Sequence, residues 1–374
     1  MRPLLFILLA APAVATAQTT PRPLIATQIL YVTPDSARAD FAGRILVDRS
    51  GLILFGRDSP PVNGHCATTL FAFAPNGLMV HLGPGGSDPH GSIGGWLGPR
   101  DLDSLWVGMD TAVAVLGPKR EVARVALAAE PFGPLADSTS WYDYGPLAAY
   151  SDGTVLAQLY RREPNWGGIG GELSRALLVR VDWRNHWQRV VAAHPWSTAC
   201  HARDRWGKEF VIPYCAESRL GVSPSGNYIA EAFVEAGRDG FTVLSLSANG
   251  DTNFRKHFVM PTVPMPDYAT RSGNHVLDSL LLPEARALVH VPTHRREFDA
   301  VIADDDGSIW IDLDVGDGIP HRWIEIDRRG RLVGQVVLPK FTRVKGGLAD
   351  ELWGLVQDPT GPHHGVVRYK ITKP

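Results

Sequence analysis

The stretch "GSIW" at 307–310 decides the fold, because close variants of it recur along the chain. Each copy begins with Gly or Asp and ends on apolar residues. The other copies are "GLIL" at 51–54, "DSLW" at 103–106, "GTVL" at 153–156, "GNYI" at 226–229 and "DELW" at 350–353. Consecutive copies start 52, 50, 73, 81 and 43 residues apart. Self-similarity at such spacing is typical of architectures that repeat one supersecondary unit.

The residues around each copy predict what the unit is. Before the copy stands a short apolar strand and a tight turn that contains Gly, as in "AVIADDDG" at 300–307. After it, alternating apolar residues flank a turn pair, as around Asn76-Gly77, Asn249-Gly250 and Arg329-Gly330. Such pairs between alternating segments indicate β-hairpins. Each unit is therefore predicted to be a four-stranded antiparallel meander.

The last unit runs out of chain before its fourth strand. A separate strand-like segment, "LIATQILYVT" at 24–33, precedes the first complete unit and has no partner there. We expect it to supply the missing strand, because this closes the repeat into a ring and leaves no long sheet edge exposed.

These units, with a turn, an apolar strand often carrying Trp, and a hairpin, resemble the six-bladed β-propellers of the NHL-repeat and TolB-like group. The resemblance covers nearly all of residues 18–374 and implies one all-β domain of six four-stranded blades. A two-sheet sandwich is the alternative, but the sixfold repeat argues against it. The group includes lactonases, lyases, sensor domains and interaction modules, so its fold does not define a function.

The first residues, "MRPLLFILLAAPAVATAQ", predict a secretory signal peptide that is cleaved between Ala17 and Gln18. A positive charge at Arg2 precedes an apolar run that is shorter than the roughly 20 residues needed to span a bilayer. A membrane anchor is therefore the weaker interpretation. We expect a secreted or periplasmic protein with no integral membrane segment in residues 18–374.

Composition excludes two classes of partner. The net charge is -2 and the pI is near 6.7, which provide no basic surface for nucleic acid or anionic membranes. Gly and Pro together make up 67 of 374 residues, as expected for short strands joined by many turns. We expect a monomer.

The connections between predicted strands divide into two sets. Turns inside hairpins are tight and lie at one end of every unit. The other end carries all the long connections, which are expected at 56–69, 83–100, 128–145, 161–175, 192–219, 259–298 and 357–364. Long loops on a rigid scaffold usually carry function. One of them has Val276, Leu277, Leu280 and Leu281 at helical spacing, which predicts a short helix packed on a blade junction.

Three arginines occupy one repeat position. Arg44, Arg219 and Arg343 each stand seven residues before a repeat start, where the innermost strand would border the central channel. Together they could bind a carboxylate or phosphate. The alternative is that they pair with acidic neighbours such as Glu217 or Asp350 and hold blades together.

Aromatic residues suggest a second kind of ligand surface. Trp141 and Tyr144 fall in "STSWYDYG", and Trp166 lies in another long connection. Around a funnel, such rings would stack on a sugar or a planar group. Burial between blades is the equally supported alternative.

The three cysteines allow one disulfide. Cys200 and Cys215 close a short loop in an exported chain, and we expect this pair to be bonded. Cys66 could pair with either of them, and the sequence does not choose.

Acidic residues raise the question of calcium. Asp304, Asp305 and Asp306 fall in a predicted turn, where Asp favours local hydrogen bonds. Asp312, Asp314 and Asp317 also suggest calcium ligands and lie at the opposite end, where Asp314 and Asp317 leave a surface calcium site open. We expect no other cofactor.

Taken together, these features predict an exported binding module. Its ligand would be a small, anionic or carbohydrate-like molecule, or a peptide or protein, bound on the long-loop face. The alternative is a hydrolase or lyase with its active site at the channel mouth.

Overall fold

The computed structural model describes most, but not all, of the chain. The described residues are 21–32, 45–47, 53–58, 68–73, 79–84, 95–101, 104–108, 112–116, 121–126, 141–150, 154–162, 175–182, 187–195, 201–207, 209–215, 218–223, 225–235, 239–260, 264–294, 298–313, 320–348, 350–357 and 364–373. The predicted signal peptide at 1–17 lies outside them.

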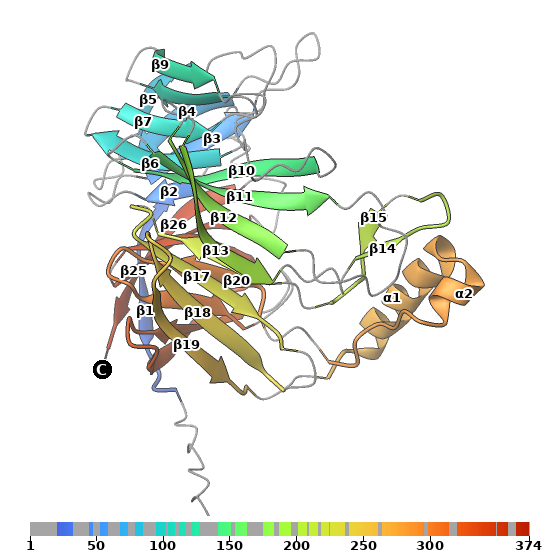
Figure 1. Cartoon of the computed structure of the whole chain (residues 1–374). Helices are drawn as coiled ribbons and strands as arrows, with labels where there is room; N and C mark the ends of the chain where they lie inside the picture. The colour runs from blue at the N-terminus through green and yellow to red at the C-terminus, as the bar shows by residue number, and fades with distance from the viewer. Residues whose placement is uncertain are drawn as a thin grey trace, which may run out of the picture.

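Within these residues, strands form six four-stranded antiparallel sheets (Figure 1). Sheet I holds β2 (Ile45–Val47), β3 (Ile53–Asp58), β4 (Thr68–Phe73) and β5 (Met79–Pro84). Sheet II holds β6 (Gly95–Asp101), β7 (Ser104–Gly108), β8 (Ala112–Leu116) and β9 (Glu121–Ala126). Sheet III holds β10 (Trp141–Ala149), β11 (Thr154–Arg162), β12 (Arg175–Asp182) and β13 (Trp187–Pro195).

The second half of the chain continues the pattern. Sheet IV holds β16 (Arg219–Val222), β17 (Tyr228–Phe233), β18 (Phe241–Ser247) and β19 (Thr252–Phe258). Sheet V holds β20 (Ala300–Ala303), β21 (Ile309–Asp312), β22 (His321–Ile326) and β23 (Leu332–Leu338). Sheet VI holds β24 (Thr342–Leu348), β25 (Glu351–Gln357), β26 (His364–Thr372) and, as its outer strand, β1 (Ile25–Val32). The prediction of an all-β chain with repeated four-stranded antiparallel units is confirmed.

Local sequence explains the turns within these sheets. In sheet V, Gly307 and Gly330 end the two hairpin turns with φ of 87° and 73°. Glycine adopts this left-handed conformation without a steric cost, and other residues rarely do. Both turns match the glycine positions that the repeat predicts.

Neighbouring sheets pack through their innermost strands and their faces. Strand β16 lies beside β20, β20 beside β24, β24 beside β2, and β6 beside β10. A cluster that includes Ala148 and Leu246 joins sheet III to sheet IV, and Phe241 with Ile324 joins sheet IV to sheet V. Trp310 and Leu352 belong to the cluster between sheets V and VI. The core is therefore a series of sheet-to-sheet interfaces.

Two of the long connections fold into a separate unit, called the accessory module here. It consists of the hairpin β14 (His201–Arg203) and β15 (Glu209–Val211) with the helices α1 (Asp267–Leu280) and α2 (Pro283–Arg286). These elements lie together to one side of the sheets (Figure 1). Their shared core contains Ala202, Ile212, Leu277, Leu281, Val289 and Val291. The predicted helix is present, but it packs on this hairpin and not on a blade junction.

Another sequence expectation is corrected near sheet III. The segment 128–145 was expected to be a long connection, yet strand β10 already begins at Trp141. Trp141 and Tyr144 pair with Arg162 and Leu159 of β11. The aromatic residues of "WYDYG" are compatible with a strand as well as with a loop, and pairing with β11 decides between them.

No helix among the described residues has both the length and the apolar character required to cross a membrane.

Candidate functional site

The long-connection end of sheets IV and V brings four strand ends together. Arg219 is the first residue of β16, and Asp299 directly precedes β20. The Arg219 Nε–H donates a hydrogen bond of 2.9 Å to the Asp299 carbonyl oxygen. The Asp299 N–H donates to the carbonyl oxygen of Asp312 at the end of β21, at 2.8 Å. These bonds connect residues that are far apart in sequence.

Asp312 also forms a buried pair with His321, the first residue of β22. The His321 Nδ1 lies 2.7 Å from the Asp312 Oδ2, and both side chains are buried. A carboxylate can only accept, so the ionised Asp312 requires that Nδ1 carries the proton. A carboxylate that holds an imidazole in one tautomer is the arrangement that positions histidines for acid–base catalysis. The pair can equally serve as a buried structural contact.

Sequence reasoning missed this pair. Asp312 drew attention only as a possible calcium ligand, and His321 was not singled out. The two residues are nine apart and face each other because β21 and β22 are antiparallel neighbours. An Asp that ends one strand and a His that begins the next was the available signal.

The structure describes two of the three predicted arginines. Arg219 is half-buried, and its bond to Asp299 connects sheet IV to sheet V. Arg343 is the second residue of β24 and is exposed. Arg44 immediately precedes β2 and lies outside the described residues. The Arg219 contact joins the two sheets through a backbone carbonyl, so pairing with acidic neighbours and convergence of all three arginines on one anion both stay predictions.

Several other predicted site residues lie partly or wholly outside the described part of the chain. Trp141 and Tyr144 are placed by backbone alone, as residues of β10, and Trp166 falls outside the described ranges. Cys215 is disulfide-bonded, whereas Cys200 and Cys66 both fall outside. Its pairing with Cys200 therefore stays a prediction, as does a calcium site at Asp314 and Asp317, which are also outside.

The aspartates of the β20–β21 turn do form the local hydrogen bonds that were predicted. Asp304 Oδ1 accepts from the Asp305 N–H at 2.6 Å, and Asp306 Oδ1 accepts from the Ser308 N–H at 2.7 Å. Asp305 Oδ1 additionally accepts from the Ser225 N–H of sheet IV's turn at 2.9 Å. Among the described residues, no group of three or more His, Cys, Asp or Glu side chains is arranged to hold a metal ion.

The accessory module presents large apolar side chains to solvent. Trp206, in the β14–β15 turn, is 72% exposed, and Leu282, between the two helices, is 55% exposed. Tyr268 and Leu288 of the same module are also exposed. The Arg205 N–H donates to the Leu280 carbonyl oxygen at 2.8 Å, which brings the hairpin turn to the end of α1. Trp206 and Leu282 thus each lie within two residues of this hydrogen bond.

No protein-family model and no curated protein sequence matches this chain. Among solved structures, a member of the DUF4221 family from Bacteroides vulgatus is 10% identical with a TM-score of 0.47, covering 93% of this chain and 97% of that one. An oligogalacturonate lyase in complex with manganese is 11% identical with a TM-score of 0.42, covering 95% and 98%. A gluconolactonase from Xanthomonas campestris is 12% identical with a TM-score of 0.37, covering 93% and 99%. At these identities, none of those activities is transferred to this chain.

Proposed function

We propose that this chain is an exported, closed six-bladed β-propeller that binds a peptide or protein partner on its long-loop face. Six sheets with neighbour contacts from β16 through β20 and β24 to β2, and from β6 to β10, support a ring. The position of β1 in sheet VI supports closure between the two chain ends. The repeat pattern supports placement in the NHL-repeat and TolB-like group.

The exposed apolar surface of the accessory module carries this proposal. Trp206 and Leu282 are large side chains held on a unit with its own core, so they are not fraying loop residues. Exposing apolar area of this kind costs free energy in water, and such patches mark interaction surfaces. Tryptophan is among the residues that contribute most to binding energy at protein interfaces.

The same face also suits a small ligand. If Arg44, Arg219 and Arg343 border the channel together, they provide donors for an anionic group, and Trp141, Tyr144 and Trp166 provide stacking for a sugar-like ring. Titration of the purified protein and of its arginine variants with small anions tests this ligand. A partner bound to the accessory module and a small anion in the channel are compatible, because they use different residues.

A second candidate, a hydrolase or lyase, is favoured by one observation. The buried Asp312–His321 pair provides an oriented imidazole at the long-connection end of sheet V. In that mechanism His321 would accept or donate a proton while Asp312 stabilises its orientation. With a substrate that the natural chain hydrolyses or cleaves, His321→Gln should still bind the substrate but lose turnover. An unchanged turnover rate would exclude this role for His321.

A photocrosslinking experiment tests the partner proposal. The full chain carries a photoreactive residue at position 208, two residues after Trp206 in the sequence, in the exported fraction of its native cells. We expect one defined crosslinked partner, which is lost in Leu282→Ser but kept in the matched control Val337→Ser, since these side chains are 55% and 54% exposed on the module and on sheet V. Equal loss in both variants, or equal retention, would contradict a module-specific interface.

Export is tested separately by mass spectrometry of the mature chain. The expected mature protein begins at Gln18, and a chain that retains residues 1–17 would overturn the cleaved signal peptide.

A further inference from the structure

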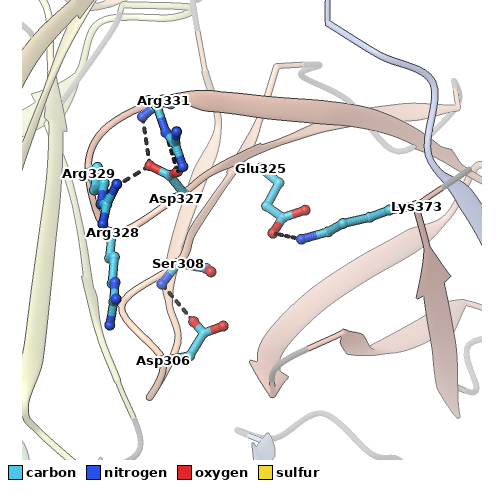
Figure 2. A pocket seen from close by; sticks show the side chains of 8 residues that line it. All are labelled: Asp306, Ser308, Glu325, Asp327, Arg328, Arg329, Arg331 and Lys373. Carbon is cyan, nitrogen blue, oxygen red and sulfur yellow. Dashed lines mark hydrogen bonds and ion pairs between the residues drawn. The ribbon is translucent and has the colours of Figure 1, made fainter.

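The short-turn end of sheet V carries a pocket of about 470 Å³ that lies away from the long connections. The described residues lining it come from the β20–β21 turn, the β22–β23 hairpin and the end of β26, and Figure 2 shows them around the cavity. They are Asp306, Ser308, Glu325, Asp327, Arg328, Arg329, Arg331 and Lys373. The pocket thus combines sheet V with the C-terminal segment of sheet VI.

Two of its four cationic side chains are engaged by carboxylates. The Arg331 Nε donates to the Asp327 Oδ2 at 2.7 Å. The Lys373 Nζ donates to the Glu325 Oε1, also at 2.7 Å. Asp327 further accepts the N–H of Arg329 at 2.9 Å. These contacts leave one wall of the pocket nearly neutral.

The other two cations differ from this pair. The side chains of Arg328 and Arg329 are exposed, and no ion pair within the described part of the chain engages their guanidinium groups. The remaining carboxylate, Asp306, is partly used by the Ser308 N–H. With four cations and three carboxylates the lining carries one excess positive charge, which attracts a small anion.

A second, independent observation points to a ligand that also carries hydrogen-bond donors. The Glu325 side chain is only 3% exposed, and its Oε2 is buried with no hydrogen-bond partner. A buried carboxylate oxygen without a donor is costly. The neighbouring Oε1 is held by Lys373, a flexible side chain that is 55% exposed, so a hydroxyl can reach the carboxylate by displacing the lysine.

We propose that this pocket binds a small hydroxylated carboxylate. The ligand's carboxylate would lie between Arg328 and Arg329, whose planar guanidinium groups bind carboxylates in a bidentate manner. Its hydroxyl groups would donate to Glu325 and interact with Ser308 at the floor. The site is distinct from the proposed partner surface and does not depend on it.

The charges discriminate against other ligand classes. An amine would gain from Glu325 but would be repelled by the Arg328 and Arg329 guanidinium groups, which leave the lining with one excess positive charge. A divalent cation meets the same repulsion, and the carboxylates here do not form a metal-binding group. A carboxylate without hydroxyls would leave the Glu325 Oε2 unsatisfied.

Three probes separate the contribution of the ligand's carboxylate from that of its hydroxyl groups. Glycerate carries a carboxylate and hydroxyls, propionate carries only the carboxylate, and glycerol carries only hydroxyls. Titration of the full chain is followed by the NMR shifts of the Gly307 and Gly330 amides, which lie in the two turns beside the pocket. We expect glycerate to bind at least about tenfold more tightly than either partial probe, since each partial probe lacks one of the two sets of charge-assisted hydrogen bonds.

Variants then assign the binding to named groups. Arg328→Gln with Arg329→Gln should weaken glycerate at least about tenfold, whereas Lys340→Gln, an exposed lysine outside the pocket, should leave it unchanged. Glu325→Gln should reduce the preference for glycerate over propionate. Equal shifts with all three probes, no shift at the two turn glycines, or binding that survives the double arginine substitution would overturn the proposal.

Discussion

The two faces of sheet V are built from alternate residues of the same strands, yet they are chemically different. Toward sheet IV the strands β21 and β22 present four isoleucines, namely Ile309, Ile311, Ile324 and Ile326. On the alternate positions, the face toward sheet VI, they carry Trp310, Asp312, Trp323 and Glu325. Successive residues of a strand point to opposite faces, so one sequence encodes both surfaces.

The second face is polar at both of its ends. The Asp312–His321 pair lies at the long-connection end and the Glu325–Lys373 pair at the short-turn end. Between them, Trp310 and Trp323 are buried with indole N–H groups that have no hydrogen-bond partner. Buried apolar area stabilises an interface without specifying one register, whereas a buried polar pair is satisfied only in one arrangement. Our hypothesis is that packing on the face toward sheet IV supplies most of the stability. The polar pairs on the face toward sheet VI instead determine how the two sheets are aligned.

The largest effect is expected on the apolar face. Phe241→Ala removes a fully buried ring whose centroid lies 5.2 Å from that of Phe298. The lost packing and the cavity should lower the free energy of unfolding by about 3–5 kcal/mol. Urea denaturation measures this loss, and Val337→Ala on the exposed surface should change it by less than about 0.5 kcal/mol. If Phe241→Ala lowered the free energy of unfolding by less than about 1 kcal/mol, packing toward sheet IV would not be the main source of stability.

The next effect tests the polar face. Asp312→Leu removes the acceptor of a buried His321 N–H and should cost about 3 kcal/mol. Replacing both residues, as Asp312→Leu with His321→Leu, should restore most of that stability, because neither group of this pair is then buried without the other. Denaturant unfolding of both variants provides the comparison. A double variant as unstable as the single one would show that the pair contributes more than register.

A smaller effect is expected at Gly221, where the backbones of sheets IV and V lie close together. A Cβ at Gly221 of β16 would lie 2.7 Å from the Val301 carbonyl oxygen, and backbone there cannot move aside easily. Gly221→Ala should therefore destabilise by about 1–3 kcal/mol. Gly347→Ala in β24 is the matched control, because its Cβ would meet nothing nearer than 3.4 Å. If the two variants unfolded at the same temperature, the close backbone approach at Gly221 would not be what limits substitution there.

The smallest effect is a change in pH dependence. Burial raises the pKa of the Glu325 carboxyl, although Lys373 opposes this. Since the folded pKa is the higher one, the ionised carboxylate opposes folding at neutral pH, and this opposition disappears as pH falls toward the unfolded value of 4.5. In Glu325→Gln, the gain in stability between about pH 7.5 and about pH 5 should therefore be smaller than in the natural chain.

Asp327→Asn is the control for that measurement. Partial burial of Asp327 acts to raise its pKa, but hydrogen bonds from Arg331 and Arg329 keep the pKa below 3.8. Its stabilising contribution is present above 3.8 and is lost only as pH falls further. The pH dependence of stability in Asp327→Asn should thus differ from that of the natural chain only at acidic pH. An unchanged slope in Glu325→Gln between about pH 5 and about pH 7.5 would contradict the raised pKa of that carboxyl.

Much of the local structure could be predicted, and the reason is visible in sheet V. Alternation in "RWIEI" at 322–326 and the Gly330 turn indicate β22, β23 and the hairpin between them, because both signals act over a few residues. Prediction was weaker where patterns were ambiguous. The aromatic segment at Trp141 was assigned to a loop and lies in β10, since only the partner strand β11 distinguishes the two.

The candidate sites were harder to predict than the strands. Arg219 was found from its repeat position, but its hydrogen bond to Asp299 spans 80 residues of sequence. In the accessory module, Arg205 is hydrogen-bonded to Leu280, which belongs to a different insertion. Neither segment carries a sequence signal that indicates this contact. The pocket depends on Lys373 reaching Glu325 from another sheet.

The sequence by itself therefore determined the repeat, the strands, the tight turns and the end of the sheets at which the long connections lie. Periodicity, β propensity and glycine turns act between residues that are close in the chain, so they can be recognised without a structure. The tertiary structure alone decided which insertions meet, that Asp312 faces His321, and that Glu325 lies beneath Lys373. Those contacts depend on how sheets are placed against one another, and that placement is determined by packing over the whole chain.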